Sequence, residues 1–365
     1  MSWLEKYTFP TEASLASLSI AKRIYNRVIA RTLSHGTTTA AYFATIDVAP
    51  TNLLADLCLE KGQRAFVGRV CMDRMSPDYY RDESAQQSIQ KTEECIHHVR
   101  SIDPKFALVS PIITPRFGPT CTSEVLMGLG KLQKETNLPV QTHLSENHNE
   151  IQLVAELFPT SKDYTDVYDT HGLLGPKTIL AHCIHLSDSE REVIKAREAK
   201  ISHCPTSNSS ITSGTARVRW LLDAGIDVGL GTDMSGGYSP SLLEAARHAL
   251  LVSRHAAMAQ TSEAETERVK LSVEEVLYLA TRGGAKVVGL ENKIGGFGVG
   301  MEWDAQLIGV DTVSGDGELD GREGPVDVFG WESWEDKVAK WVFGGNERNT
   351  KKVWVKGRMV HERRD

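Results

Sequence analysis

Apolar residues near the start of the chain recur at the spacing of a helix. Between residues 13 and 34 they fall three or four positions apart, which is the period of an amphipathic helix. The predicted apolar face consists of Ile20, Ile24, Val28 and Leu33. Gly36 comes soon after, and glycine often ends a helix because it adopts the left-handed conformation without strain. The pattern therefore predicts a helix over residues 13–34 that stops at Gly36.

A second pattern follows, in which short apolar runs alternate with helical stretches. Runs such as Thr178-Ile179-Leu180-Ala181 are almost continuously apolar, as is typical of parallel strands covered on both faces. The predicted strands are residues 37–43, 64–70, 106–113, 139–143, 178–182, 201–204 and 227–231. Because each is followed by a helical stretch, the order predicts an α/β fold with a parallel sheet.

The number of these units predicts a barrel with a gap. A closed (β/α)8 barrel has eight strand–helix units in roughly 250 residues. The sequence supplies seven, and it begins inside the helix that would follow the first strand. We therefore expect a (β/α)8-type barrel that lacks its first strand, with strands two to eight in residues 1–290.

The tail of the chain follows a different pattern. Residues 304–310 and 352–360 each predict one strand that has no helix paired with it, and a helical stretch lies between them. We assign residues 291–365 to a remnant of a small β-sandwich and a C-terminal helix.

Composition narrows the range of partners. The chain has 365 residues and a formal net charge of −7, whereas nucleic-acid binding relies on clustered Lys and Arg. No apolar run approaches the roughly 18 residues of a membrane-spanning helix, and the start lacks the pattern of a secretory signal. The cysteines form no Cys-x-x-Cys pair, which argues against a zinc ribbon. We expect a cytosolic protein that acts on a small molecule and binds neither nucleic acid nor membrane.

Candidate chemistry lies directly after predicted strands. His143, His182 and Asp233 each stand at or just beyond a strand end, and in parallel barrels these ends converge on one site. Imidazole and carboxylate together suit zinc, with iron as the second choice, better than calcium or magnesium. Glu146 comes three residues after His143, where it can move a proton beside a metal site without being a ligand. The sequence thus predicts a metal-dependent hydrolase.

Each candidate also has a structural alternative. A single histidine after a strand is more often a hydrogen-bonded structural residue. Glu146 could instead begin the next helix, where a carboxylate is favoured. Asp233 could cap the turn that follows it, and Arg116 could be a surface cation. The four residues at or just after strand ends are less easily explained by chance together than any one of them alone; they are His143, Glu146, His182 and Asp233.

The motifs resemble those of a known family. Residues 142–147, 203–208 and 229–233 read Thr-His-Leu-Ser-Glu-Asn, His-Cys-Pro-Thr-Ser-Asn and Gly-Leu-Gly-Thr-Asp. These segments resemble the amidohydrolase superfamily in its aminohydrolase branch and, within that branch, the guanine deaminases. The narrower resemblance rests on residues 6–10, 36–39, 62–68, 114–117 and 236–239. It runs from the first residues to about residue 290, and the tail matches more loosely.

The resemblance implies hydrolytic deamination of guanine to xanthine and ammonia. It implies that His143 and Asp233 bind zinc, with His182 as a candidate third ligand. Asp233 would also touch the attacking water, His182 would hydrogen-bond that water or the tetrahedral intermediate, and Glu146 would move the proton.

The resemblance also implies the substrate contacts and the assembly. The guanidinium of Arg116 would donate to the purine and the ring of Phe117 would stack on it. His143, Glu146 and Asp233 would line the same pocket. The implied partner is a purine base, and the implied assembly is a homodimer.

The sequence departs from the family at one point. The family takes two further zinc ligands from a His-x-His pair at the end of the first strand, and this sequence contains no such pair. Because catalytic zinc needs three protein ligands, we expect the activity of this chain to be impaired. The alternatives are a non-catalytic relative that acts through assembly, and an aminohydrolase for another base.

Overall fold

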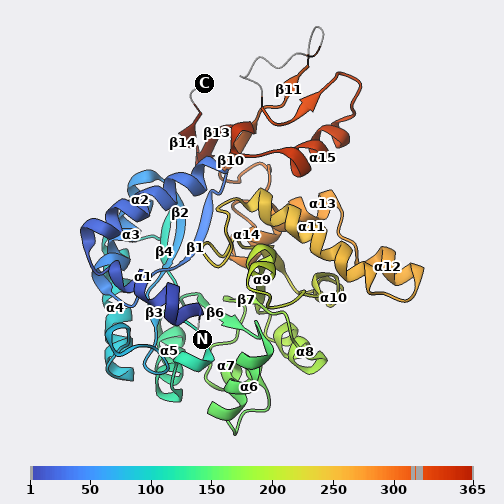
Figure 1. Cartoon of the computed structure of the whole chain (residues 1–365). Coiled ribbons are helices and arrows are strands. Elements are labelled where there is room, and N and C mark those ends of the chain that lie inside the picture. Colours follow the sequence, from blue (N-terminus) through green and yellow to red (C-terminus); the bar gives the residue numbers. More distant parts are fainter. Residues whose placement is uncertain (1–2, 314–316, 318–323, 364–365) are drawn as a thin grey trace. The chain divides into compact units, whose positions relative to one another are not determined.

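The computed structural model describes residues 3–313, 317 and 324–363, and these residues form two compact units (Figure 1). Described residues within 1–29, 39–203 and 221–227 make the first unit, and those within 30–38, 204–220 and 228–365 make the second. The predicted domain boundary near residue 290 rests on the sequence pattern, whereas this division rests on spatial proximity. The domain boundary therefore stays a prediction.

The strands of the first unit run parallel and alternate with helices (Figure 1). β1 pairs with β2 and β2 with β4, while β6 pairs with β7 and β7 with β8. A parallel bridge between Ile113 and Val140 joins the two sets. The strands are β1 (Thr39–Phe43), β2 (Arg64–Gly68), β3 (Val70–Cys71), β4 (Val109–Pro111), β5 (Thr114–Pro115), β6 (Val140–Leu144), β7 (Thr178–His182) and β8 (Lys200–His203).

Helices connect these strands, as a parallel sheet requires. In the first unit they are η1 (Leu4–Thr8), α1 (Phe9–Ser14), α3 (Val48–Lys61), η2 (Asp78–Tyr80), α4 (Ala85–Ile102), η3 (Gly118–Thr120), α5 (Ser123–Thr136), α6 (His148–Leu157), α7 (Tyr164–Thr170) and α8 (Asp188–Ala196). All residues of β2 and β7 are buried, which agrees with the nearly continuous apolar runs in the sequence. Of the described residues, none lies in a helix long and apolar enough to cross a membrane.

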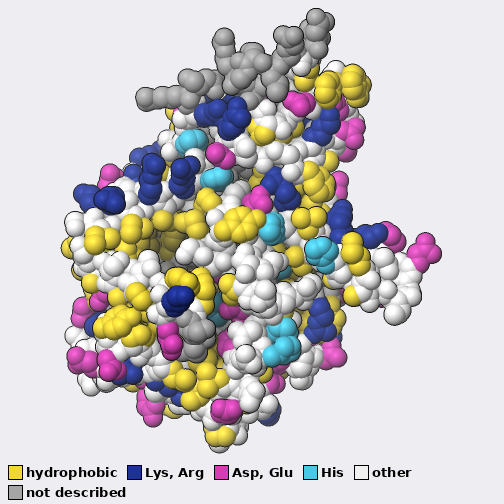
Figure 2. Space-filling view, viewed as in Figure 1, with side chains coloured by type: hydrophobic (Ala, Val, Ile, Leu, Met, Phe, Trp, Pro, Cys, Tyr) yellow, Lys and Arg dark blue, Asp and Glu magenta, His cyan; other side chains and the backbone are white. Residues whose placement is uncertain are grey.

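The predicted first helix is present, but its buried face is different. The segment forms α1 and then α2 (Leu18–Ser34), separated by a turn. Ile20 and Ile24 are 43% and 38% exposed, whereas Ala21 and Ile29 are fully buried. Figure 2 shows basic side chains gathered over α2, on its exposed side. The prediction of the face is confirmed for Leu33, which is buried, but it was wrong for Ile20 and Ile24. Apolar residues occur on both sides of this helix, and periodicity alone does not say which side meets the core.

The predicted helix stop is confirmed. α2 ends at Ser34, and Gly36 has φ +82°, with its N–H donating to the carbonyl of Leu33 at 2.9 Å. A side chain at this position would be strained, because only glycine adopts this conformation without a steric penalty.

The second unit holds the remaining elements, including one more barrel-type strand. Its helices and strands are α9 (Pro205–Ser210), β9 (Val228–Leu230), α11 (Leu242–Met258), α12 (Glu263–Val269), α13 (Val273–Tyr278), η4 (Leu279–Gly283), α14 (Gly284–Val287), β10 (Ala305–Ile308), β11 (Asp311–Thr312), β12 (Asp327–Val328), α15 (Trp334–Gly344), η5 (Glu347–Asn349), β13 (Thr350–Val355) and β14 (Arg358–Glu362). α10 (Val218–Asp223) and α2 each contribute residues to both units. Every predicted barrel strand thus corresponds to an observed strand.

The tail forms an antiparallel sheet, with one correction. β10 pairs with β13, and β13 pairs with β14. Residues 352–360, predicted as a single strand, instead form a hairpin that turns at Lys356 and Gly357, whose φ values are +51° and +80°. The dipeptide Lys-Gly is a weaker turn signal than Asn-Gly or Asp-Gly, so the apolar run concealed the turn.

The first unit contains a fully buried ion pair. The side chains of Arg69 and Asp82 are fully buried and hydrogen-bonded to each other. Arg69 also donates to the carbonyl of Ile46 at 2.7 Å and to Ser88 at 3.3 Å. These contacts satisfy a guanidinium that would otherwise be very costly to bury.

We predict that Asp82→Ala lowers the free energy of unfolding by about 3 kcal/mol or more, because it leaves the Arg69 charge buried without its carboxylate. Chemical denaturation measures this change. The matched control is Asp78→Ala, which removes the exposed partner of Arg81 and should cost less than about 1 kcal/mol. Equal effects of the two substitutions would contradict the prediction.

Candidate active site

His143 lies near the end of β6 and has a defined tautomer. Its Nδ1 is 2.6 Å from the backbone carbonyl of Arg116, and a carbonyl can only accept a hydrogen bond. Nδ1 therefore carries the proton, and the lone pair is on Nε2. This arrangement is the usual one for a histidine that binds a metal through Nε2. The ring also lies 4.6 Å from that of Phe43 and 6.4 Å from that of Phe117, between centroids.

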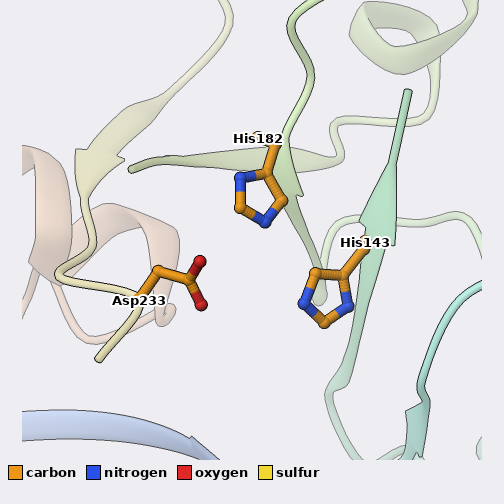
Figure 3. Close-up of side chains that lie close together, drawn as sticks. All are labelled: His143, His182 and Asp233. Carbon is orange, nitrogen blue, oxygen red and sulfur yellow. The ribbon is translucent and has the colours of Figure 1, made fainter. Parts of the chain in front are cut away.

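His182 is the last residue of β7 and lies beside His143 (Figure 3). The parallel pairing of β6 and β7 places Leu144 opposite His182. The two imidazole rings stack with centroids 5.3 Å apart and planes 19° apart. His182 is 1% exposed, so its ring is held among protein atoms.

Glu146 reaches the same place from the loop after β6. Its Oε1 lies 3.7 Å from Nδ1 of His182. The loop is fixed by the carbonyl of Ser145, which accepts from the N–H groups of Ile184 and His185 at 3.2 and 3.1 Å. Asn147, and not Glu146, caps α6, so the alternative that Glu146 begins the helix is wrong.

The backbone at these strand ends is strained. Ser145, His182 and Cys183 have φ values of +50°, +71° and +51°. Residues other than glycine rarely adopt this region, and such outliers are often found at active sites.

Asp233 follows β9 in the second unit and is also drawn in Figure 3. Its φ is +45°, and its carbonyl accepts a hydrogen bond from the N–H of Gly237 at 2.6 Å. A Cβ on Gly236 would lie 2.5 Å from Oδ2 of Asp233, so a larger residue at this position would force the carboxylate to shift. His143, His182 and Asp233 each offer a ligand atom of a kind that zinc takes.

Arg116 is buried and ion-paired, so the alternative of a surface cation is wrong. It is 9% exposed, and its two terminal nitrogens donate to the two carboxylate oxygens of Glu12 at 2.7 and 3.0 Å. Its neighbour Phe117 is half-buried, and the planes of the Phe117 and His143 rings are 69° apart. The side chains of both residues therefore lie in the same unit as the two histidines.

A buried network near Glu146 was missed by the sequence analysis. The hydroxyl of Tyr164 donates to Glu150 at 2.8 Å and accepts from the N–H of Gly118 at 2.9 Å. Burial raises the pKa of Glu150 to about 7, and the nearby charge of Glu146 acts in the same direction. Tyr168 donates to the carbonyl of His143 at 2.9 Å. No spacing in the sequence links these residues, because they come from separate elements.

His203 is the first residue of the His-Cys-Pro-Thr-Ser-Asn motif, and the sequence pattern predicts no role for it. It ends β8, is 1% exposed, and neither ring nitrogen has a hydrogen-bond partner in the described part of the chain. Burial, together with the charge of His182, lowers the pKa of His203 to about 3. Its imidazole is therefore neutral at physiological pH. A neutral imidazole has one nitrogen that donates a hydrogen bond and one that accepts.

Comparisons with known proteins identify the family of the chain. The model of the amidohydrolase family matches residues 1–360. The probable guanine deaminase of Schizosaccharomyces pombe is 49% identical over 99% of this chain and 66% of its own length. The guanine deaminase of Homo sapiens is 43% identical over 99% of this chain and 77% of its own length. The chain therefore spans about two thirds to three quarters of the length of these relatives.

Solved structures show the same fold. The structure of guanine deaminase from C. acetobutylicum with bound guanine has a TM-score of 0.87 and 37% identity, covering 99% of this chain and 80% of that one. The E. coli guanine deaminase has a TM-score of 0.87 and 31% identity, covering 99% and 79%. These matches confirm the predicted barrel class. They lend no support to the expectation that the catalytic activity of this chain is impaired, and that expectation stays a prediction. The chain belongs to the amidohydrolase family, a family of metal-dependent hydrolases, and the relatives named here are guanine deaminases.

Proposed function

We propose that this protein catalyses the hydrolytic deamination of guanine to xanthine and ammonia. The observation that carries the proposal is the arrangement at the ends of β6 and β7, where two imidazoles and the Glu146 carboxylate gather beside Arg116 and Phe117. The names of the relatives supply the substrate class, a purine base.

The proposed metal ligands are His143 and Asp233, with His182 as a candidate third ligand. Zinc is the first choice and iron the second, because two imidazoles and a carboxylate form a borderline donor set. The hydrogen bond from Nδ1 of His143 to the carbonyl of Arg116 fits this role, since it directs Nε2 toward a ligand position. When bound, the metal supplies Lewis acidity that lowers the pKa of a water molecule.

Glu146 is the proposed proton carrier. It takes one proton from the attacking water and passes it to the ring nitrogen, where that proton stays in xanthine. It then takes the second proton, from the hydroxyl group formed on the ring carbon, and passes it to the amine, which leaves as ammonia when the C–N bond breaks. Its carboxylate lies beside His182, which is suited to hydrogen-bond the water or the tetrahedral intermediate. Asp233 is proposed to accept a hydrogen bond from the same water.

Arg116 and Phe117 are proposed to hold the purine. A guanidinium donates to the carbonyl oxygen and ring nitrogens of guanine, and an aromatic ring packs against its face. His143, Glu146 and Asp233 would form the rest of the pocket. A cytosolic homodimer is the proposed form of the protein.

The direct test incubates the purified, zinc-loaded protein with guanine and measures xanthine and ammonia. Adenine and cytosine serve as comparison substrates. Turnover of another base without turnover of guanine would overturn the substrate assignment. Failure to bind zinc or to act on any base would favour the alternative of a non-catalytic assembly subunit.

We predict that Glu146→Gln lowers kcat by about 100-fold or more, because the amide cannot carry the proton, while the metal content stays unchanged. Steady-state kinetics and metal analysis measure the two quantities. Glu156→Gln, at an exposed position on the following helix α6, is the matched control. Retained activity in the Glu146 variant would contradict the proposed role.

We also predict that His143→Ala reduces bound zinc to less than about a tenth of the wild-type content, because a ligand is lost from a site with few ligands. Elemental analysis after dialysis measures this content. His148→Ala, which removes an exposed imidazole at the start of α6, should leave it unchanged. Equal zinc content in both variants would exclude His143 as a ligand.

A further inference from the structure

The N-terminal helix α1 brings a carboxylate to the residue proposed to bind the purine. Glu12 of α1 and Arg116 are separated by 104 positions in the sequence, yet they form a two-pronged ion pair at 2.7 and 3.0 Å. The side chains of Arg116 and Glu12 are 10% and 21% exposed. Such a bidentate pair fixes the plane of the guanidinium as well as its position.

Glu12 is itself held from a second direction. The hydroxyl of Tyr80 donates to Oε2 of Glu12 at 2.9 Å and accepts from the N–H of Ile46 at 3.3 Å. The pKa of Tyr80 lies well above its usual value because of burial and the adjacent Glu12, so this hydroxyl keeps its proton and remains a donor. The carboxylate thus has a defined orientation before any ligand binds.

An apolar cluster anchors the helix that carries Glu12. Phe9 is fully buried and packs with Ile46, Val70, Met72 and Tyr80. The guanidinium of Arg116 lies over the Phe9 ring, 5.3 Å from its centroid. The guanidinium is therefore held between an aromatic ring and the Glu12 carboxylate, which leaves it little freedom to rotate.

Arg116 also contacts the proposed metal ligand through its backbone. Its carbonyl accepts from Nδ1 of His143 at 2.6 Å. The backbone of this residue therefore orients the imidazole, while its side chain is proposed to meet the purine. A rotation of the guanidinium would move the purine contact relative to His143.

We propose that Glu12 is a positioning residue that holds the Arg116 guanidinium in the orientation in which it binds the purine, so that α1 forms part of the substrate site. This inference rests on the proposed function. Glu12 acts through Arg116 and does not touch the reacting atoms. Tyr80 and Phe9 support the pair by fixing the carboxylate and the guanidinium face.

Guanine binding to the full chain tests the proposal without turnover. Equilibrium dialysis with radiolabelled guanine is done in the zinc-loaded Glu146→Gln background. We expect Glu12→Gln to weaken binding about tenfold, as expected for loss of one charged hydrogen-bond partner. Glu5→Gln removes an exposed carboxylate from the same N-terminal segment and should leave the affinity unchanged.

A double-mutant cycle separates positioning from general destabilisation. If Glu12 acts through Arg116, then Glu12→Gln combined with Arg116→Gln binds guanine no more weakly than Arg116→Gln alone. In a protein that turns over guanine, Glu12→Gln should raise KM about tenfold and change kcat by less than about threefold. Thermal unfolding of each variant shows that the comparison is made on folded protein.

Two outcomes overturn the proposal. Unchanged guanine affinity in Glu12→Gln, or losses that add in the double variant, would exclude the positioning role while the proposed function stands. Absence of guanine binding in the Glu146→Gln background itself would defeat the proposed function and the inference together.

Discussion

The parallel pairing of β6 and β7 is the constraint on which the candidate active site depends. Their register sets His143 opposite Ala181 and Leu144 opposite His182, so two histidines 39 positions apart reach the same sheet edge. Parallel strands all end on one side of the sheet, and the loops that follow them meet there. The strained backbone at Ser145 and His182 follows from this constraint, because each chain must turn sharply as it leaves its strand.

Arg116 links the parts of the site that would otherwise be independent. Its carbonyl sets the tautomer and orientation of His143, and its guanidinium is held by Glu12. If the purine binds as proposed, the distance between the substrate and the metal ligand is set by one residue.

Three ionisable side chains of the first unit that are mostly buried have partners from other elements or loops of the chain. Arg69 meets Asp82, Arg116 meets Glu12, and Glu150 meets the hydroxyl of Tyr164. Burying an ion without a partner is costly, so these contacts select the packing of the helices that carry them. Two of these contacts involve α1, α6 and α7, so the geometry around Arg116 and Glu150 depends on how these helices pack in the first unit.

The sequence alone determined the order of the elements and the residue types of the site. Strand positions, the stop at Gly36 and the placement of His143, Glu146 and His182 followed from periodicity and strand ends, which are local properties of the chain. The sequence did not predict the buried face of α2 or the hairpin at Gly357. The local pattern is ambiguous when apolar residues lie on both sides of a helix or continue through a turn.

The partners of the site residues were decided by tertiary structure. Glu12, Tyr80, Glu150 and Tyr164 are ordinary polar residues in the sequence, and nothing in their spacing relates them to Arg116 or Glu146. Packing of the barrel buries them next to the candidate site. Because buried polar groups are nearly always hydrogen-bonded, each then pairs with a group from another segment of the chain.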